Sequence, residues 1–389
     1  MAQPVPVPHD AGEWNGKWGG AAAASNGTIF CTPCNERSFL EVHSGGFDGG
    51  RHVSPVDLPE DYQQLIHQSD AFAGGCCTSD GRIYLVPTFF NNRVGEPYLW
   101  TLSYAPATGE FQLLNTEGTA VVQELDEESV FWSIAVAPNG KLYSPPANGS
   151  QVAVLDPDSG TFELIRGVQR RSQKNKWTGI ATAGDHYMFC SPGRARAVLV
   201  IDSNTHELHY LWDGELFDEA GAVQYVDEDG DPIPDYLAAD VQLWSGIAAA
   251  HNSKLYCAPC DADCVLVIDP GNWKLYTLGL NPPCVDSTSA NKWSGICLAE
   301  DGRLYCAPSC AGSILVIDPV CDAIGYISIA GLDPWQGWQS SGDFKWSGIA
   351  AACGRIWCVP DRADALLTML TPKPPLCLPG HVGVPPDVV

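Results

Sequence analysis

The sequence predicts an all-β fold: a seven-bladed β-propeller of four-stranded antiparallel blades, with small residues on the inner strands. Three observations predict it. One repeat occurs seven times, each copy joins two short β-rich runs through a tight turn, and the copies run nearly from one end of the chain to the other. We therefore expect a single domain over residues 1–389, with blades that start near residues 16, 70, 129, 175, 242, 291 and 344.

Each repeat has a leading aromatic residue and a second aromatic residue, and a proline lies three positions after the second aromatic. The clearest copies span residues 243–259 and 292–308. The leading aromatics are Trp18, Phe72, Phe131, Trp177, Trp244, Trp293 and Trp346. The prolines are Pro33, Pro87, Pro146, Pro192, Pro259, Pro308 and Pro360. Because all seven copies keep these positions, the repeat sets the number of blades.

Four strands are expected in each blade, in chain order A to D. Strand A is a run of small residues, such as 246–250, which allows seven copies to approach one axis. A tight turn such as Asp301-Gly302 follows strand A. Strand B ends at the repeated proline. Strand C is rich in β-branched residues, as in 265–268. In strand D apolar and polar residues tend to alternate, as in 273–278. The tail after Thr371 is a poor strand, so the N-terminal region from Pro4 to Pro8 is expected to supply or cover the last outer edge.

The segments Gly-Ile-Ala, Asp-Gly-Arg-Leu-Tyr and Val-Ile-Asp-Pro resemble the repeats of the NHL, SMP-30/gluconolactonase and streptogramin-lyase-like propellers. The resemblance covers most of the chain. It implies a top face for ligands, formed by the starts of strand A and the loops between strands B and C. The metal-binding carboxylate and amide of the SMP-30-like lactonases are replaced here by Gly, Ala, Ser and Ile, and the lyase's catalytic histidine has no evident counterpart. The resemblance therefore implies a fold and leaves the activity open.

Basic residues gather on this top face, although the chain carries a formal charge of −25. Anionic groups are natural partners of such a surface, through charge-assisted hydrogen bonds and cation–π contacts. The predicted ligand-binding residues are Lys17, Trp18, Lys176, Trp177, Arg194, Arg196, Trp244, Lys292, Trp293, Lys345, Trp346 and Arg362. The alternative is that residues repeated in every blade build the blades, with the lysines paired to nearby aspartates. Departures from the repeat, at 71–77 and at Phe131-Trp132-Ser133, are then better functional markers.

An acidic insertion spans residues 213–241 and contains a candidate calcium site. It resembles the thrombospondin type 3 calcium motif, which implies Ca²⁺ as a possible cofactor, and alternating carboxylates around a glycine turn suit that ion. The predicted ligands are Asp227, Asp229, Asp231 and Asp235. The alternative is a solvated acidic loop. The cysteines repeated on strand B fall one to a blade, too far apart to share a metal, and are expected to be small buried hydrophobes.

The overall composition limits the partners and the compartment. A strongly acidic chain argues against nucleic acid and anionic membranes, and no apolar run approaches the roughly 18 residues of a membrane helix. The N-terminus lacks the pattern of an export signal, so the 16 cysteines are expected to be reduced, in the cytoplasm or another reducing intracellular compartment.

Two function hypotheses follow. The first is a binding or assembly propeller that presents its Trp/Lys/Arg face to a partner protein or a small anionic ligand. The second is a lyase or a lactone- or ester-type hydrolase that acts on an anionic substrate in the axial funnel. The first is preferred because no acid–base pair or nucleophile motif is evident.

Overall fold

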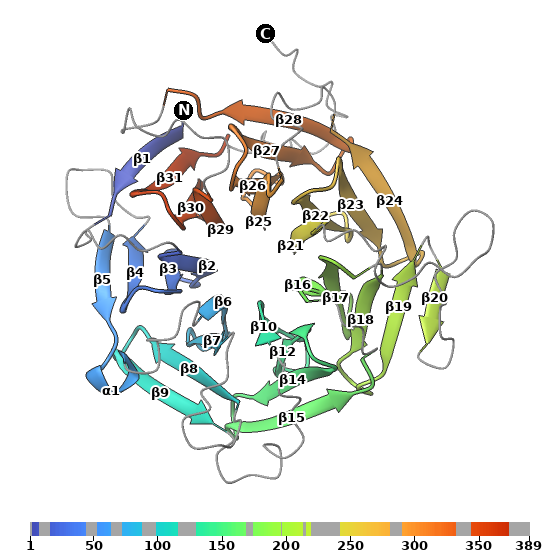
Figure 1. Ribbon diagram of the computed structural model, residues 1–389, viewed down its shortest axis with the longest axis horizontal. Helices are drawn as coiled ribbons and strands as arrows, with labels where there is room; N and C mark the ends of the chain where they lie inside the picture. Colours follow the sequence, from blue (N-terminus) through green and yellow to red (C-terminus); the bar gives the residue numbers. More distant parts are fainter. Residues whose placement is uncertain are drawn as a thin grey trace, which may run out of the picture.

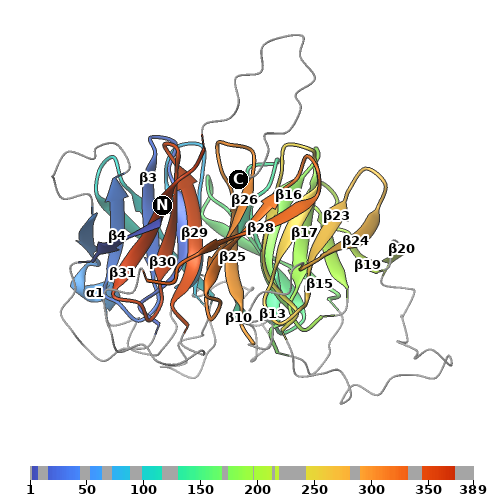
Figure 2. The ribbon, with the colours of Figure 1, turned by 90° about the horizontal axis from the view of Figure 1, so that it is seen from above.

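The fold is the seven-bladed propeller that the repeat predicts (Figure 1). The computed structural model describes residues 2–7, 16–43, 53–63, 72–87, 99–115, 130–168, 174–195, 197–212, 215–218, 242–280, 290–331 and 344–372. Seen from the side, the blades stand next to one another and their strands run along the ring axis (Figure 2). No helix in these ranges is long and apolar enough to cross a membrane.

The strands follow the predicted order. Blade one contains β2 (Trp18–Ala23), β3 (Thr28–Pro33), β4 (Ser38–His43) and β5 (Val53–Asp57), followed by the short helix α1 (Glu60–Gln63). Blade two contains β6 (Phe72–Cys77), β7 (Ile83–Pro87), β8 (Trp100–Ala105) and β9 (Glu110–Asn115). Blade three contains β10 (Val130–Phe131), β11 (Ala135–Val136), β12 (Leu142–Ser144), β13 (Pro146–Asn148), β14 (Gln151–Asp156) and β15 (Thr161–Arg166). Blade four contains β16 (Trp177–Ala183), β17 (Tyr187–Pro192), β18 (Val198–Asp202), β19 (Leu208–Trp212) and β20 (Glu215–Asp218).

The remaining blades are regular. Blade five contains β21 (Trp244–Ala249), β22 (Leu255–Pro259), β23 (Cys264–Asp269) and β24 (Lys274–Gly279). Blade six contains β25 (Trp293–Leu298), β26 (Leu304–Pro308), β27 (Ser313–Asp318) and β28 (Ala323–Ser328). Blade seven contains β29 (Trp346–Ala352), β30 (Arg355–Pro360), β31 (Ala365–Leu370) and, as its outer strand, β1 (Ala2–Pro6).

The strand register confirms the alignment of the repeats. In all seven blades the leading aromatic pairs with the predicted proline, for example Trp244 with Pro259 and Phe131 with Pro146. In most blades a β-bulge follows this pair. A bulge bends the strand and re-aims the side chains after it. In six blades the residue after the leading aromatic lies at the central cavity described below.

Glycine lets the inner strands touch along the ring. A Cβ on Gly348 would lie 2.8 Å from the backbone carbon of Gly20 in the next blade, and one on Gly295 would lie 2.9 Å from the carbonyl oxygen of Ser347. Real Cβ atoms do not approach backbone this closely, so the side-chain-free position is required by packing. This is the physical basis of the small-residue strand A in the repeat.

The hydrophobic core lies between neighbouring blades. One cluster joins Tyr256 and Val267 of blade five to Trp293 and Leu304 of blade six, all fully or almost fully buried. The strand-B cysteines are buried free thiols in the same layers: Cys31, Cys190, Cys257, Cys306 and Cys358. Burial raises the pKa of each of these thiols. They therefore pack as small hydrophobes, as predicted.

The ring closes through the N-terminal segment. β1 pairs antiparallel with β31, from Ala2 opposite Met369 to Pro6 opposite Ala365. Because β1 is the outermost strand of its sheet, Pro4 and Pro6 do not interrupt a hydrogen-bond ladder on both sides. The expectation that this proline-containing region supplies the last outer edge is confirmed.

Two blades depart from four regular strands. In blade four, β20 adds a fifth strand outside β19. In blade three the inner strand is interrupted: β10 ends at Phe131, β11 starts at Ala135, and the two belong to separate sheets. The interruption holds the Phe131-Trp132-Ser133 segment that departs from the repeat in sequence.

Candidate functional site

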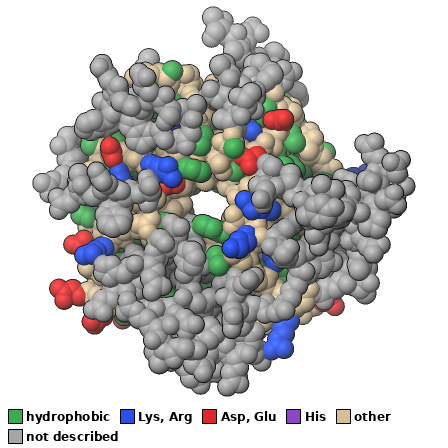
Figure 3. All heavy atoms as spheres, in the orientation of Figure 1, with side chains coloured by type: hydrophobic (Ala, Val, Ile, Leu, Met, Phe, Trp, Pro, Cys, Tyr) green, Lys and Arg blue, Asp and Glu red, His purple; other side chains and the backbone are tan. Residues whose placement is uncertain are grey.

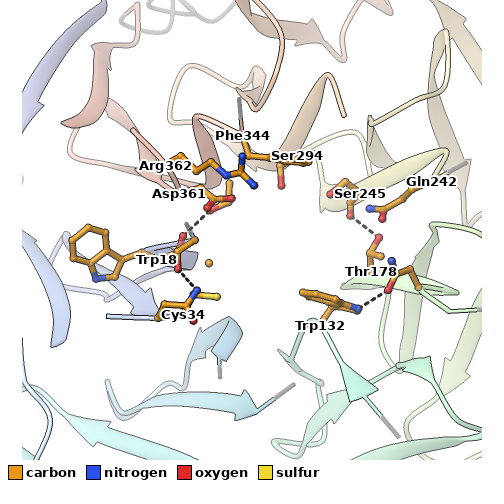
Figure 4. Close-up of a pocket in the computed structure, with 15 residues that line it drawn as sticks. Trp18, Cys34, Trp132, Thr178, Gln242, Ser245, Ser294, Phe344, Asp361 and Arg362 are labelled. Carbon is orange, nitrogen blue, oxygen red and sulfur yellow. Dashed lines mark hydrogen bonds between the residues drawn. The ribbon is translucent and has the colours of Figure 1, made fainter. Parts of the chain in front are cut away.

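Among the described residues, inner strands and top-face loops from six blades line a cavity of about 640 Å³ (Figure 4). In each of these blades, the residue directly after the leading aromatic forms part of the cavity wall. These residues are Gly19, Trp132, Thr178, Ser245, Ser294 and Ser347. The loops between strands B and C add Asn35, Asp361 and Arg362. The cavity therefore lies on the face where the sequence analysis placed the ligand.

The four predicted lysines are engaged within the fold. Lys17 and Lys292 are only 4% and 1% exposed. The Nζ atoms donate to the following acceptors: Lys17 to Asp364 Oδ1 (2.5 Å) and Ala363 O (3.3 Å), Lys176 to Gly149 O, Lys292 to Asp261 O (3.1 Å), and Lys345 to Ala311 O (2.9 Å). Every acceptor lies in the B–C loop of the preceding blade, with blade seven preceding blade one. None of the four lysines is among the described residues that line the cavity.

The five predicted tryptophans also have a repeated structural contact. Each indole Nε1–H donates to a carbonyl at or next to the start of strand C in its own blade. The pairs are Trp18 to Ser38 (3.0 Å), Trp177 to Ala197 (2.9 Å), Trp244 to Cys264 (2.9 Å), Trp293 to Ser313 (2.8 Å) and Trp346 to Ala365 (2.9 Å). Of the five, Trp18 is the one among the described lining residues of the cavity. These contacts support the alternative that repeated residues build the blade.

Arg362 differs from the lysines because its charged group points into the cavity. Its guanidinium carbon lies 4.9 Å from the ring centroid of Phe344, and both side chains are half-buried in the wall (Figure 4). Within the described ranges no salt bridge joins this guanidinium to a carboxylate. A cation stacked on a ring and open to a cavity can bind an anion in a bidentate manner.

The other predicted residues fall elsewhere. Arg194 lies in the B–C loop of blade four, where its backbone N–H donates to Asn175 O, and it is not among the described lining residues. Arg196 and the predicted calcium ligands Asp227, Asp229, Asp231 and Asp235 lie outside the described residues. The calcium site stays a prediction.

Trp132 occupies a position that is small in the neighbouring blades. Its half-buried indole lies in the cavity wall, and its Nε1–H donates to Asn175 Oδ1 at 3.1 Å (Figure 4). Asn175 has a positive φ of 58° and donates its own N–H to Asn148 Oδ1 at 3.0 Å. This segment departs from the repeat in sequence, but Trp132 was not among the predicted site residues. The signal was the second aromatic directly after Phe131.

Asp361 and Phe344 were not among the predicted site residues, because each lies at a position whose residue type differs from blade to blade. Asp361 follows the proline that ends strand B, and Phe344 precedes the lysine of blade seven. Only closure of the ring brings them together with Trp132, which is more than 200 positions away in the chain. A site assembled from several blades therefore has no continuous motif in the sequence.

Groups typical of metal or histidine chemistry are missing from the described part of the cavity. Its described lining includes no histidine, and His186, His206 and His251 lie in turns at the opposite ends of the strands. Across the described ranges, no group of three or more His, Cys, Asp and Glu side chains is placed to hold a metal. On the face shown in Figure 3, separate patches of Lys and Arg side chains lie near the central opening, with hydrophobic side chains between them at its rim.

Comparison with known proteins identifies the fold. No family model matches the sequence, and no protein of curated function matches it. Virginiamycin B lyase from Staphylococcus aureus is similar in structure, with a TM-score of 0.63 and 13% identity over 95% of this chain and 99% of the lyase. The β-propeller domain of Cps50 (Swd1) from Myceliophteria thermophila gives 0.57 and 7%, over 95% and 99%. YCF48, solved with a D1 peptide, gives 0.53 and 11%, over 95% and 98%.

The fold and the cavity define the class of this protein: a seven-bladed β-propeller with a cavity of mixed polar and apolar lining at the inner ends of its blades. In fold it is similar to virginiamycin B (streptogramin) lyase and to NHL-like propellers. The similar structures include lyases as well as binding and assembly propellers, all at low identity. At these identities the similarity concerns the fold alone.

Proposed function

We propose that this protein is a binding propeller whose cavity takes a small molecule through an anionic group held by Arg362. The observation that carries the proposal is the contrast between Arg362 and the repeated lysines. The lysine amines donate to loops of the preceding blade, whereas the Arg362 guanidinium stacks on Phe344 and faces the cavity. Arginine in such a setting is suited to carboxylate or phosphate groups.

The shape of the site favours a small molecule over a partner protein. A volume of about 640 Å³ falls in the range of small-molecule pockets, which is roughly 300–1,000 Å³. Hydroxyl and amide groups stand around the wall, from residues such as Ser294 and Gln242. Such groups orient a ligand by hydrogen bonds once its charge is held.

The test compares two arginines of blade seven. Arg362→Gln removes the charge at the cavity, and Arg355→Gln removes a charge at the opposite end of β30. Acetate, benzoate and phosphate serve as probes in isothermal titration calorimetry. We expect at least one probe to bind the wild type and Arg355→Gln, and Arg362→Gln to weaken that binding by roughly 10- to 100-fold. Equal affinity for all three proteins, or no binding of any probe, would refute the proposal.

Asp361 favours a second candidate, an enzyme that acts on an anionic substrate. Its carboxylate lies beside Arg362 in the cavity wall. In a lyase or a lactone- or ester-type hydrolase, a carboxylate can accept a proton while the guanidinium stabilises developing negative charge. Under this candidate Asp361→Asn abolishes turnover of a lactone or ester probe and leaves binding of the probe within a few fold. A variant that turns the probe over at the wild-type rate would exclude Asp361 as the base.

A further inference from the structure

Trp132 breaks the symmetry of the ring at one blade. The described equivalents of this position are Gly19, Thr178, Ser245, Ser294 and Ser347. Small side chains there leave space at the inner ends of the blades, and an indole fills part of that space from one side. A large side chain in one of several equivalent places makes the cavity asymmetric, so it can distinguish the two ends of a ligand.

The substitution disturbs the local structure. The inner strand of blade three is interrupted from residue 132 to residue 134, where the neighbouring blades have continuous strands. The buried Ser133 Oγ, at a position that is glycine in other blades, has no hydrogen-bond partner among the described residues. Departures of this kind lower stability and are characteristic of functional positions. The interrupted strand therefore indicates a functional role for the Trp132 side chain.

The indole is held so that its face remains for a ligand. Its polar edge donates to Asn175, which Asn148 fixes in turn. The repeated Trp18 and Trp293 differ, because they are buried between strands at 1% and 0% exposure. A half-exposed ring with its N–H satisfied offers an apolar π surface for stacking against another flat ring.

The two unusual residues stand on different sides of the cavity. Trp132 comes from blade three and Arg362 from blade seven, and Figure 4 shows them across the cavity from each other. Resting on the function proposed above, we infer that the ligand is an aromatic acid, with its ring stacked on Trp132 and its anionic group on Arg362. The hydroxyl-bearing wall between them faces the linking part of the molecule.

The test uses two acids that differ in the flat ring alone: 3-phenylpropanoate and 3-cyclohexylpropanoate. In calorimetry, the wild type is expected to bind the aromatic acid about 3- to 10-fold more tightly. Trp132→Leu should lose this preference and Trp132→Phe, which keeps a ring, should retain most of it. Arg362→Gln should weaken the binding of both acids.

The outcomes separate this inference from the proposed function. Equal binding of the two acids by the wild type, with both weakened in Arg362→Gln, would overturn the aromatic ligand and leave the anion site standing. If the wild type binds neither acid but binds acetate, benzoate or phosphate, the aromatic ligand is overturned and the anion site stands. If it binds none of these five probes, both are overturned. Circular dichroism verifies the fold of each variant, and if Trp132→Leu does not fold, the wild type and Trp132→Phe decide the question.

Discussion

Replacing Lys292 by glutamate is expected to destabilise the fold. The side chain is 1% exposed, its Nζ donates to Asp261 O at 3.1 Å, and Asp263 Oδ1 lies 3.9 Å away. The backbone N–H of Lys292 donates to Cys260 O, and its carbonyl accepts from Ser309 N–H. One residue therefore joins the loops of blades five and six, and a glutamate would place a carboxylate against an oxygen-lined site.

The contacts set the size of the effect. Lys292→Met removes a charged hydrogen bond without adding a new charge and should lower the free energy of unfolding by about 1.5–3 kcal/mol. Lys292→Glu adds a buried charge without a partner and should lower it by about 3–5 kcal/mol. Lys174, an exposed lysine two positions before Lys176, provides the control. Lys174→Glu should change the free energy by no more than about 0.5 kcal/mol.

Equilibrium urea unfolding, followed by circular dichroism, measures all three variants. A Lys292→Glu protein with the wild-type midpoint and slope would refute the structural role of the amine. The ligand hypothesis for the lysines makes the opposite prediction. Under it, Lys292→Glu combined with Lys345→Glu abolishes anion binding and leaves the fold intact.

Three further predictions concern the ring and its thiols. Gly348→Ala should lower the free energy of unfolding by about 1–3 kcal/mol, because the new Cβ would meet the backbone of Gly20, whereas Gly325→Ala has open space and should be neutral within about 0.5 kcal/mol in urea melts. Burial raises the pKa of the strand-B thiols, so the unfolded chain ionises first and the free energy of unfolding should fall as pH rises above roughly 8.5. At pH 8, Ellman's reagent should label exposed Cys321 and Cys353 at once and reach the strand-B thiols only on unfolding. Rapid labelling of the buried set, or a flat stability profile up to pH 10, would contradict this picture.

The architecture was predictable because the repeat recurs once in each blade. The leading aromatic and the proline recur in all seven copies, which predicted the number of blades, and the structure adds that the two residues are cross-strand partners in each blade. The expectation for the N-terminal segment also held, since a proline-rich tail made an alternative outer strand necessary. The fifth strand of blade four was not predicted because β20 lies inside the acidic insertion, which carries no repeat signal.

The candidate site was predictable only in part. Sequence showed that basic residues collect on one face, but it could not show where each side chain points. Lys292 and Arg362 are both cations next to repeated elements, yet one donates to a carbonyl of its neighbour and the other faces the cavity. Trp132 stood out by its departure from the repeat, and its place in the wall depends on a strand break that no local propensity indicates.

The pairing of β1 with β31 has a consequence for the growing chain. Residues 2–6 are synthesised more than 350 positions before their partners at 365–369. At translation rates of about 5–20 residues per second, this strand waits roughly 20–70 seconds for its sheet. Throughout that interval the nascent polypeptide carries β1 without its partner strand and an incomplete ring of blades. Because an unpaired strand edge can pair with another chain, we expect both to be open to mispairing until the final blade emerges.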